Sequence, residues 1–259
     1  MRWRPTDDTL GMIGIPHSED WQFRRLAAMT EKSYVRDPWS KHFPQRFHLT
    51  GKQLLTRAAS AIPSCPLPTV SGFTAWIYSL YLADPDVDVL KESADIEEDI
   101  LEARRDWSSY SEFRHFKFSP WHQVHCGMGS VGAGDRRQSY LIPDLSVNGQ
   151  SLRANPDLVF IHEDDGQILI IEIKFSMARI PYNLWPNVWA QLWAYSKIPE
   201  LAAATRVSVV GEVWGQNAGR WRRNDLCSPV YLRAAQSRDP RESKFDAFFS
   251  KLFSIYSSG

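Results

Sequence analysis

Two carboxylates and a lysine lie in or beside apolar segments of this sequence, and their spacing indicates shared chemistry. Glu172 and Lys174 directly follow the run Ile168–Ile171. Asp157 lies fifteen residues before Glu172, on the other side of the short acidic turn Glu163–Gly166. Side chains alternate along a strand, so residues two apart leave the same face. Burying a carboxylate and an ammonium there is costly without a purpose. We interpret the two carboxylates and the lysine as an active site. The alternative is an ordinary salt bridge from Lys174 to Glu172 or Asp157.

The chemistry that such a group supports is metal-assisted hydrolysis. Two carboxylates a few ångströms apart repel each other, and a divalent cation is the usual resolution. Oxygen-only ligands favour Mg²⁺ or Mn²⁺. A cation of this kind polarises a phosphate, lowers the pKa of a bound water and clamps the scissile group. Lys174 would then orient the attacking water or stabilise the developing negative charge.

Strands are predicted where these residues lie. Hydrophobic patterning predicts consecutive strands over Ser139–Val147, Gln150–His162 and Gln167–Ser176, and Asn148-Gly149 is a strong hairpin signal between the first two. The apolar run in the third strand suits a central strand that is covered on both faces. Pro156 cannot donate to a ladder, so the second strand is expected to be bulged or frayed there.

Helices are predicted around these strands. The expected helices are Ser18–Lys32, Gly51–Ala61, Val87–Trp107, one that begins at Pro186, and Glu242–Ser257; a fourth strand is expected over Arg206–Trp214, and a further one before Ala235. The order helix, three-strand meander, helix, strand predicts an α/β fold whose mixed sheet is flanked by helices. Residues 1–85 are expected to be a helical and loop elaboration packed on a core of residues 86–259.

Two motifs resemble those of a known family. Asn155-Pro156-Asp157 followed by Glu172-Ile173-Lys174 resembles the signature of the PD-(D/E)XK nuclease superfamily. Gln191-Leu-Trp-Ala-Tyr195 is similar to the Gln-x-x-x-Tyr element of its RecB-like and lambda-exonuclease-like branch, and Ser93–Glu97 is similar to a helical element that supplies an acid. The resemblance covers residues from roughly 90 to 215. It implies a restriction-endonuclease-like core and metal-dependent cleavage of DNA.

The resemblance also implies a role for each matching residue. The expected metal ligands are Asp157, Glu172, the carbonyl of Ile173, and Glu97. Glu98 is the rival of Glu97 on the same predicted helix. Lys174 would act on the water, and Gln191 and Tyr195 would position the substrate. The expected cofactor is therefore Mg²⁺ or Mn²⁺.

Composition limits the remaining possibilities. The 259 residues carry 30 basic and 30 acidic side chains, so bulk charge does not indicate a nucleic-acid partner, and any basic surface must be local. Three scattered cysteines argue against a disulfide framework and predict a cytoplasmic setting. They are also too few for the four-cysteine iron–sulfur cluster of some members of this branch. No apolar run approaches the length of a membrane span.

Four other motifs have weaker claims. Asp144 also follows a proline, one strand too early in a simple meander, and is kept as a fallback. Gly127–Gly132 fits a dinucleotide fingerprint but lacks the helix that must follow, so a flexible loop is favoured. His122, His125 and Cys126 have no second ligand pair at zinc-finger spacing. The Arg220–Arg223 cluster suits phosphate contact or an ordinary solvated loop.

The sequence thus predicts a DNA nuclease and leaves an alternative. The alternative is a catalytically silent scaffold or DNA-binding subunit of a larger DNA-processing or defence complex, in which a protein partner supplies much of the grip on DNA. An enzyme that acts on RNA is a third possibility. The sequence does not distinguish cleavage from an end from internal cleavage, and it does not give the oligomeric state.

Overall fold

The structure is a computed structural model of the chain. It describes residues 51–81, 97, 101, 121–127, 139–162, 164, 166–176, 184–215, 231–238 and 243–259. The predictions for the helix Ser18–Lys32, for Glu98 and for Arg220–Arg223 lie outside the described residues, as does the predicted boundary between residues 85 and 86.

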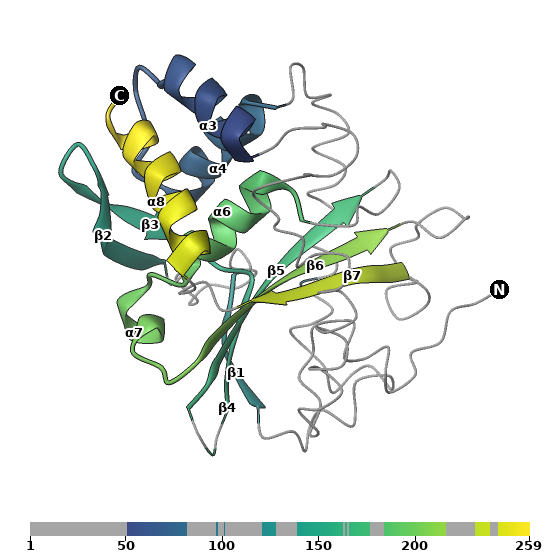
Figure 1. The fold of residues 1–259 in the computed structure, drawn as a ribbon. Helices are drawn as coiled ribbons and strands as arrows, with labels where there is room; N and C mark the ends of the chain where they lie inside the picture. The colour runs from purple at the N-terminus through teal and green to yellow at the C-terminus, as the bar shows by residue number, and fades with distance from the viewer. Residues whose placement is uncertain are drawn as a thin grey trace, which may run out of the picture.

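A mixed five-stranded sheet forms the centre of the molecule (Figure 1). Its strands, in spatial order, are β1 (Trp121–Cys126), β4 (Leu158–His162), β5 (Ile168–Ser176), β6 (Val207–Gly215) and β7 (Tyr231–Arg238). The β1–β4, β4–β5 and β6–β7 pairs are antiparallel, whereas β5 and β6 run parallel. The antiparallel β4–β5 pair is joined by a short turn, and the parallel β5–β6 pair needs a crossover, which contains helix α6 (Pro186–Tyr195).

The predicted meander is wrong in its first strand. The predicted strand Gln150–His162 is divided into β3 (Gln150–Ala154) and β4 by the segment Asn155–Asp157. β3 pairs with β2 (Tyr140–Val147) in a separate two-stranded sheet, so in the described part of the chain β2 does not join the central sheet. β1, which the patterning did not predict, takes its place. The proline in the dividing segment cannot donate to a ladder, and the chain leaves one sheet for the other there.

The hairpin turn that joins β2 to β3 is confirmed. Asn148 has φ of 50° and Gly149 has φ of 75°, so both occupy the left-handed region. A two-residue turn of this kind follows the right-handed twist of the strands that it joins. The hairpin lies against α4 and α8, beside the central sheet (Figure 1).

Four helices gather on one side of the central sheet (Figure 1). They are α3 (Gly51–Ser60), α4 (Val70–Ser79), α6 and α8 (Ser243–Ser257), and the single-turn α7 (Pro199–Ala202) follows α6. The predicted helices at Gly51, at Pro186 and near the C-terminus are confirmed, and α4 was not predicted. Thr69 caps the N-terminus of α4, because its side chain accepts a hydrogen bond from the Gly72 amide. Of the predicted helix Val87–Trp107, only Glu97 and Leu101 are described, and both are helical.

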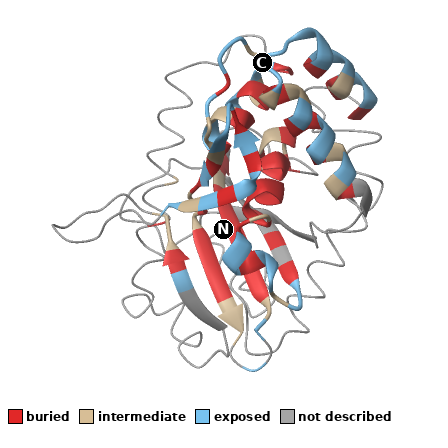
Figure 2. Cartoon of the chain, turned by 90° about the vertical axis from the view of Figure 1, so that its left-hand side faces the viewer, coloured by how far each residue is buried: buried red, intermediate tan, exposed pale blue. Residues whose placement is uncertain are grey.

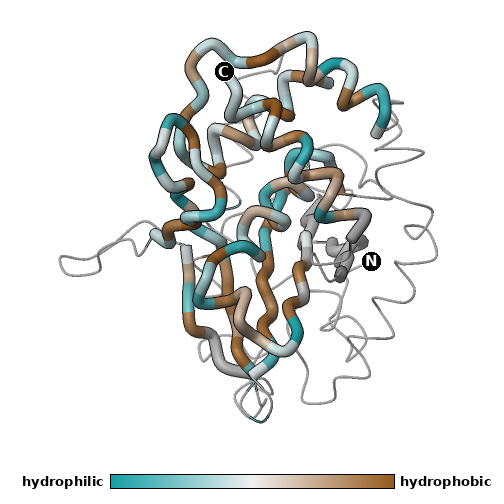
Figure 3. The backbone as a smooth tube through the Cα atoms, turned by 60° about the vertical axis from the view of Figure 1, so that its left-hand side comes forward, coloured by the Kyte–Doolittle hydropathy of each residue, from teal (hydrophilic) through white to brown (hydrophobic). Residues whose placement is uncertain are grey.

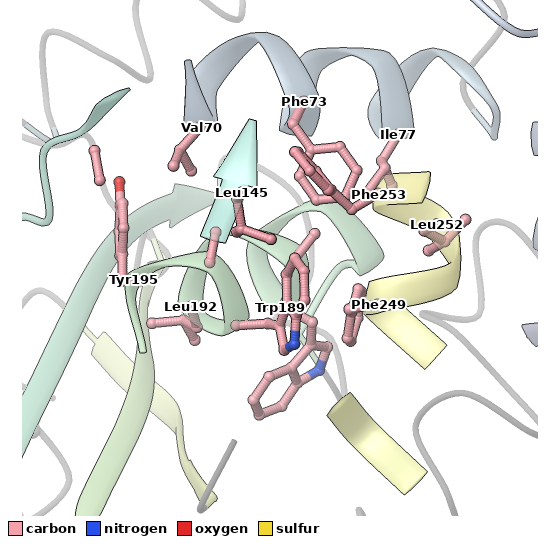
Figure 4. Packing of buried hydrophobic residues seen from close by; sticks show 14 of the residues in the cluster. Val70, Phe73, Ile77, Leu145, Trp189, Leu192, Tyr195, Phe249, Leu252 and Phe253 are labelled. Carbon is pink, nitrogen blue, oxygen red and sulfur yellow. The ribbon is translucent and has the colours of Figure 1, made fainter. Parts of the chain in front are cut away.

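Aromatic side chains fill the space between α4, α6 and α8 (Figure 4). Phe73 of α4 meets Phe253 of α8 edge to face at 5.2 Å between ring centroids, and Trp189 of α6 meets Phe245 of α8 in the same way at 5.4 Å. Such pairs contribute about 0.5–1.5 kcal/mol each beyond the area that they bury. Several of the tryptophans therefore serve the core, as the composition indicated.

The central strand β5 is covered on both faces, as its continuous apolar run predicted. Ile168 and Ile170 pack in the cluster beneath α6, while Leu169 and Ile171 are buried on the opposite face. The stretches Leu158–Phe160 of β4 and Ile168–Ile171 of β5 are buried (Figure 2) and apolar (Figure 3). Among the described residues, no helix is long and apolar enough to cross a membrane.

The cluster of α4, α6 and α8 offers a matched pair of leucine substitutions. Leu252 of α8 is completely buried, whereas Leu141 of β2 is more than half exposed. We expect Leu252→Ala to lower the free energy of unfolding by about 2–5 kcal/mol, because it leaves a cavity in the core. Leu141→Ala is expected to change it by less than about 0.5 kcal/mol. Urea denaturation followed by circular dichroism measures both; similar losses from the two variants would contradict the packing described here.

Candidate active site

The candidate site lies where β4 separates from β5. Leu158 pairs with Ile171 at the end of the β4–β5 ladder, but β5 continues to Ser176 beside β6. Backbone amides on the β4 side of this extension therefore need other acceptors. The amide of Ile173 donates to Oδ2 of Asp157 at 2.7 Å, and the amide of Phe175 donates to Oε1 of Glu97 at 2.7 Å. Two carboxylates take the place of the missing strand.

The carbonyl of Ile173 faces the same edge of the sheet. In a strand, the N–H and C=O of one residue point toward the same neighbour. Since the amide of Ile173 reaches Asp157, its carbonyl is also directed to the side from which β4 has departed. The structure therefore brings the expected carbonyl ligand to the edge where the Asp157 side chain lies.

Lys174 joins two of the carboxylates. Its Nζ lies 2.7 Å from Oε1 of Glu172 and 3.2 Å from Oε2 of Glu97. Glu172 is only 1% exposed, and the Lys174 side chain is 22% exposed. The salt bridge considered from the sequence exists, but it is buried rather than solvated. Of the two partners considered, Lys174 pairs with Glu172, and its second partner is Glu97 from a helix far away in the sequence.

The electrostatics of the site disfavour three ionised carboxylates side by side. Burial, and then the charge of Asp157, raise the pKa of Glu172 well above its usual range, although Lys174 opposes this. Burial also raises the pKa of Asp157 and of Glu97, again against the effect of Lys174. Burial alone would lower the pKa of Lys174, but the three carboxylates outweigh it and raise that pKa well above normal. With all four groups ionised, two negative charges are in excess, which is the charge of one divalent cation.

One oxygen of the Glu172 carboxyl has no donor among the described residues. Oε2 of Glu172 is buried and accepts no hydrogen bond from their N–H groups, and the Asp157 carboxyl lies within hydrogen-bonding reach of the Glu172 carboxyl. A buried carboxylate oxygen without a donor costs free energy, and a metal ion is one way to satisfy it. Even so, no three His, Cys, Asp or Glu side chains in the described ranges already converge as a metal cage. Lys174 stands between Glu97 and Glu172, and Asp157 turns one oxygen to the Ile173 amide.

Helix α6 covers the site with the Gln-x-x-x-Tyr pair. Gln191 Nε2 donates to the Tyr195 hydroxyl at 2.8 Å, and that hydroxyl donates to the carbonyl of Asn155 at 3.1 Å. Burial and the charge of Glu172 raise the pKa of Tyr195 well above its usual range, so the hydroxyl keeps its proton. Tyr195 lies at the edge of the aromatic cluster, away from Phe249 (Figure 4). Tyr195 thus contacts the segment Asn155–Asp157, which we call the turn of Asp157, and Gln191 supports Tyr195.

No family model, curated protein or solved structure matches the chain. The likeness to the nuclease superfamily therefore rests on the residues and on this geometry.

The structure brings together the residues selected from the sequence and leaves the fallback Asp144 apart. Glu97, Asp157, Glu172, Lys174 and Tyr195 are linked by the contacts above, and Gln191 joins them through Tyr195. The fallback Asp144 is exposed on β2 in the separate two-stranded sheet.

His122, His125 and Cys126 of the weaker zinc motif lie on β1, and the glycine-rich motif begins directly after this strand. His125 is buried on this strand, with its ring 5.0 Å from that of Tyr140. Gly127, the first glycine of the dinucleotide-like motif, directly follows β1, and its amide donates to the carbonyl of Asp157. Sequence reasoning missed this contact; the only available signal was a glycine beside an alternating stretch that patterning did not assign as a strand.

The ion pair between Lys174 and Glu172 predicts a stability effect. We expect Lys174→Met in metal-free buffer to lower the free energy of unfolding by about 3–5 kcal/mol, because it leaves Glu172 buried without its counter-charge. Lys197→Met removes a lysine that pairs with Asp246 nearer the surface, and we expect a loss of less than about 1 kcal/mol. Chemical denaturation in EDTA measures both variants. A Lys174→Met loss no larger than that of the control would rule out a buried ion pair.

Proposed function

We propose that this protein is a metal-dependent nuclease that hydrolyses phosphodiester bonds in DNA. The observation that carries the proposal is the buried Glu172 carboxylate, which has one oxygen without a donor among the described residues and lies beside Asp157 and Lys174. The sheet uses Asp157 and Glu97 as acceptors, but the buried pair of Glu172 and Lys174 is weak evidence for a role in stability. Chemistry is the better explanation for keeping excess negative charge at this edge of the sheet.

The side chains present fit Mg²⁺ or Mn²⁺. Asp157, Glu172 and the carbonyl of Ile173 offer oxygen donors from one edge of the sheet, and Glu97 lies next to them. Oxygen donors are what these hard cations prefer. When bound, the metal would supply polarisation of a phosphate and a bound water of lowered pKa. Oε2 of Glu172, which has no donor among the described residues, is the natural first ligand.

Lys174 has two successive roles in this proposal. Without metal, its ammonium compensates Glu172 and Glu97. With the carboxylates compensated, the Lys174 ammonium would be free to donate hydrogen bonds to the attacking water or to a phosphate oxygen that gains charge. Without metal, the three carboxylates raise the pKa of Lys174 well above its usual range and keep the ammonium protonated. Gln191 and Tyr195 hold the turn of Asp157 and border the place for substrate.

Cleavage assays test the proposal directly. Purified protein is incubated with linear duplex, circular duplex and single-stranded DNA, and with RNA, in Mg²⁺, Mn²⁺ or EDTA. We expect DNA cleavage only with metal, and a loss of about 10²–10³-fold or more in Asp157→Asn, Glu172→Gln and Lys174→Ala. Asp144→Asn is the matched control, because it removes an exposed carboxylate that also follows a proline. Equal cleavage by the parent and the three site variants would overturn the assignment; preferential cleavage of RNA would overturn the choice of DNA.

A catalytically silent scaffold is the second candidate, and one observation favours it. Lys174 already joins two carboxylates and Asp157 already bonds the Ile173 amide, so much of the charge is balanced inside the chain. Such a site can hold the edge of a sheet together without turnover. In that case the protein would serve a larger DNA-processing or defence complex.

Calorimetric titration with Mg²⁺ separates the two candidates. If the protein is a nuclease, we expect the parent protein and Asp144→Asn to bind Mg²⁺. We expect Glu172→Gln to bind it at least about 10-fold more weakly, since a direct ligand contributes at least as much affinity as the residues that orient it. A scaffold is expected to show no site-dependent binding. Binding that Glu172→Gln leaves unchanged would place the metal elsewhere and count against the nuclease site.

A further inference from the structure

The end of β1 holds the backbone of Asp157. The last paired residues of the β1–β4 ladder are Cys126 and Leu158. One step further, the amide of Gly127 donates to the carbonyl of Asp157 at 2.7 Å. Asp157 is therefore fixed twice, through its carbonyl by Gly127 and through its side chain by the Ile173 amide. Its position depends on β1 as well as on β5.

Asn155 extends the same connection. Its side-chain Nδ2 donates to the carbonyl of Gly127 at 3.0 Å, and its own carbonyl accepts from the Tyr195 hydroxyl at 3.1 Å. The next residue, Pro156, has no amide hydrogen to give. The Asn155 side chain therefore supplies a donor to β1 where the proline interrupts the backbone ladder. The turn of Asp157 is tied to β1 on one side and to α6 on the other.

Gly127 has no room for a side chain. A Cβ atom there would lie 2.5 Å from the carbonyl oxygen of Pro156 and 3.2 Å from its carbonyl carbon. Both atoms belong to the backbone, so no side-chain rotation relieves the clash. A methyl group at this position must push the end of β1 away from the turn. The close approach of the two segments is thus possible only with glycine.

We infer that Gly127 and Asn155 are positioning residues that set the Asp157 carboxylate for metal binding. This inference rests on the proposed function, because it takes Asp157 as a ligand of Mg²⁺. The interpretation of the glycine-rich motif changes accordingly: its first glycine serves the close packing of β1 on the turn. Neither residue is required to touch the metal or the substrate.

The expected effect is on metal affinity. Metal ligands have to lie within about 0.2 Å of their proper distances. A shift of the turn by even a few tenths of an ångström therefore weakens binding, and loss of a residue that orients a ligand typically lowers metal affinity about 10–100-fold. The remaining ligands on β5 stay in place, so a high concentration of Mg²⁺ is expected to restore cleavage in the variants.

The test compares Mg²⁺ affinity in Gly127→Ala, Asn155→Ala and a control of equal or greater instability. The control is Leu252→Ala, which damages the helical cluster and leaves the site residues unchanged. Calorimetric titration of the full chain with Mg²⁺ is the readout, after circular dichroism has shown that each variant is folded. We expect an affinity about 10–100-fold weaker in both positioning variants, and parental affinity in Leu252→Ala.

The outcomes are distinct. Parental Mg²⁺ affinity in Asn155→Ala and in a folded Gly127→Ala would overturn the positioning role while the proposed function stands. Equal weakening in Leu252→Ala would also overturn it, since instability alone would then explain the effect. If Gly127→Ala does not fold, Asn155→Ala decides the matter. No binding by the parent protein would overturn the inference together with the metal site on which it rests.

Discussion

The carboxylate of Glu172 sets the constraint on which the site depends. It is 1% exposed, on a strand whose neighbouring residues are isoleucines, and a charge in such surroundings must be balanced nearby. Lys174 provides part of that balance from the same face of the strand, two residues further along. The same face lies beneath α6, so the tyrosine at the end of that helix also experiences this charge. The position of Glu172 on the strand, its charge and its cover by α6 are therefore linked.

The second constraint is the open edge of β5. β4 stops pairing at Leu158, and the β5 amides beyond that point take carboxylate oxygens from Asp157 and Glu97 as acceptors. Each carboxylate thus completes the hydrogen bonding of the sheet and brings negative charge to the same edge. The fold and the candidate chemistry use the same atoms. A metal that binds there would have to share oxygens that the sheet already uses, or take those that it leaves over.

The sequence was informative about the relative placement of residues that lie close together in the chain. Alternation along a strand placed Glu172 and Lys174 on one face, and helical spacing placed Gln191 and Tyr195 together, as the structure shows. Pairing between distant segments was not readable in the same way. Periodicity indicated a strand over Ser139–Val147 but not the sheet to which it belongs. The contact of Glu97 with Lys174 joins residues 77 apart in sequence, and no local pattern specifies such a pair.

Lys174 connects the stability of the chain to its proposed activity. Burial raises the pKa of the three carboxyl groups, so keeping them all ionised beside one ammonium carries a cost in the folded state. A ligand that binds the folded state alone stabilises it. In the proposed nuclease, a divalent cation would remove this cost, and the cost would be the source of affinity for the cation. A lysine that compensates the site completely would leave no such affinity, and a site without a lysine would bury its glutamate at a much greater cost. One lysine among three carboxylates lies between these limits. This arrangement is expected of a site in which a metal ion would take over the charge compensation that Lys174 provides without it.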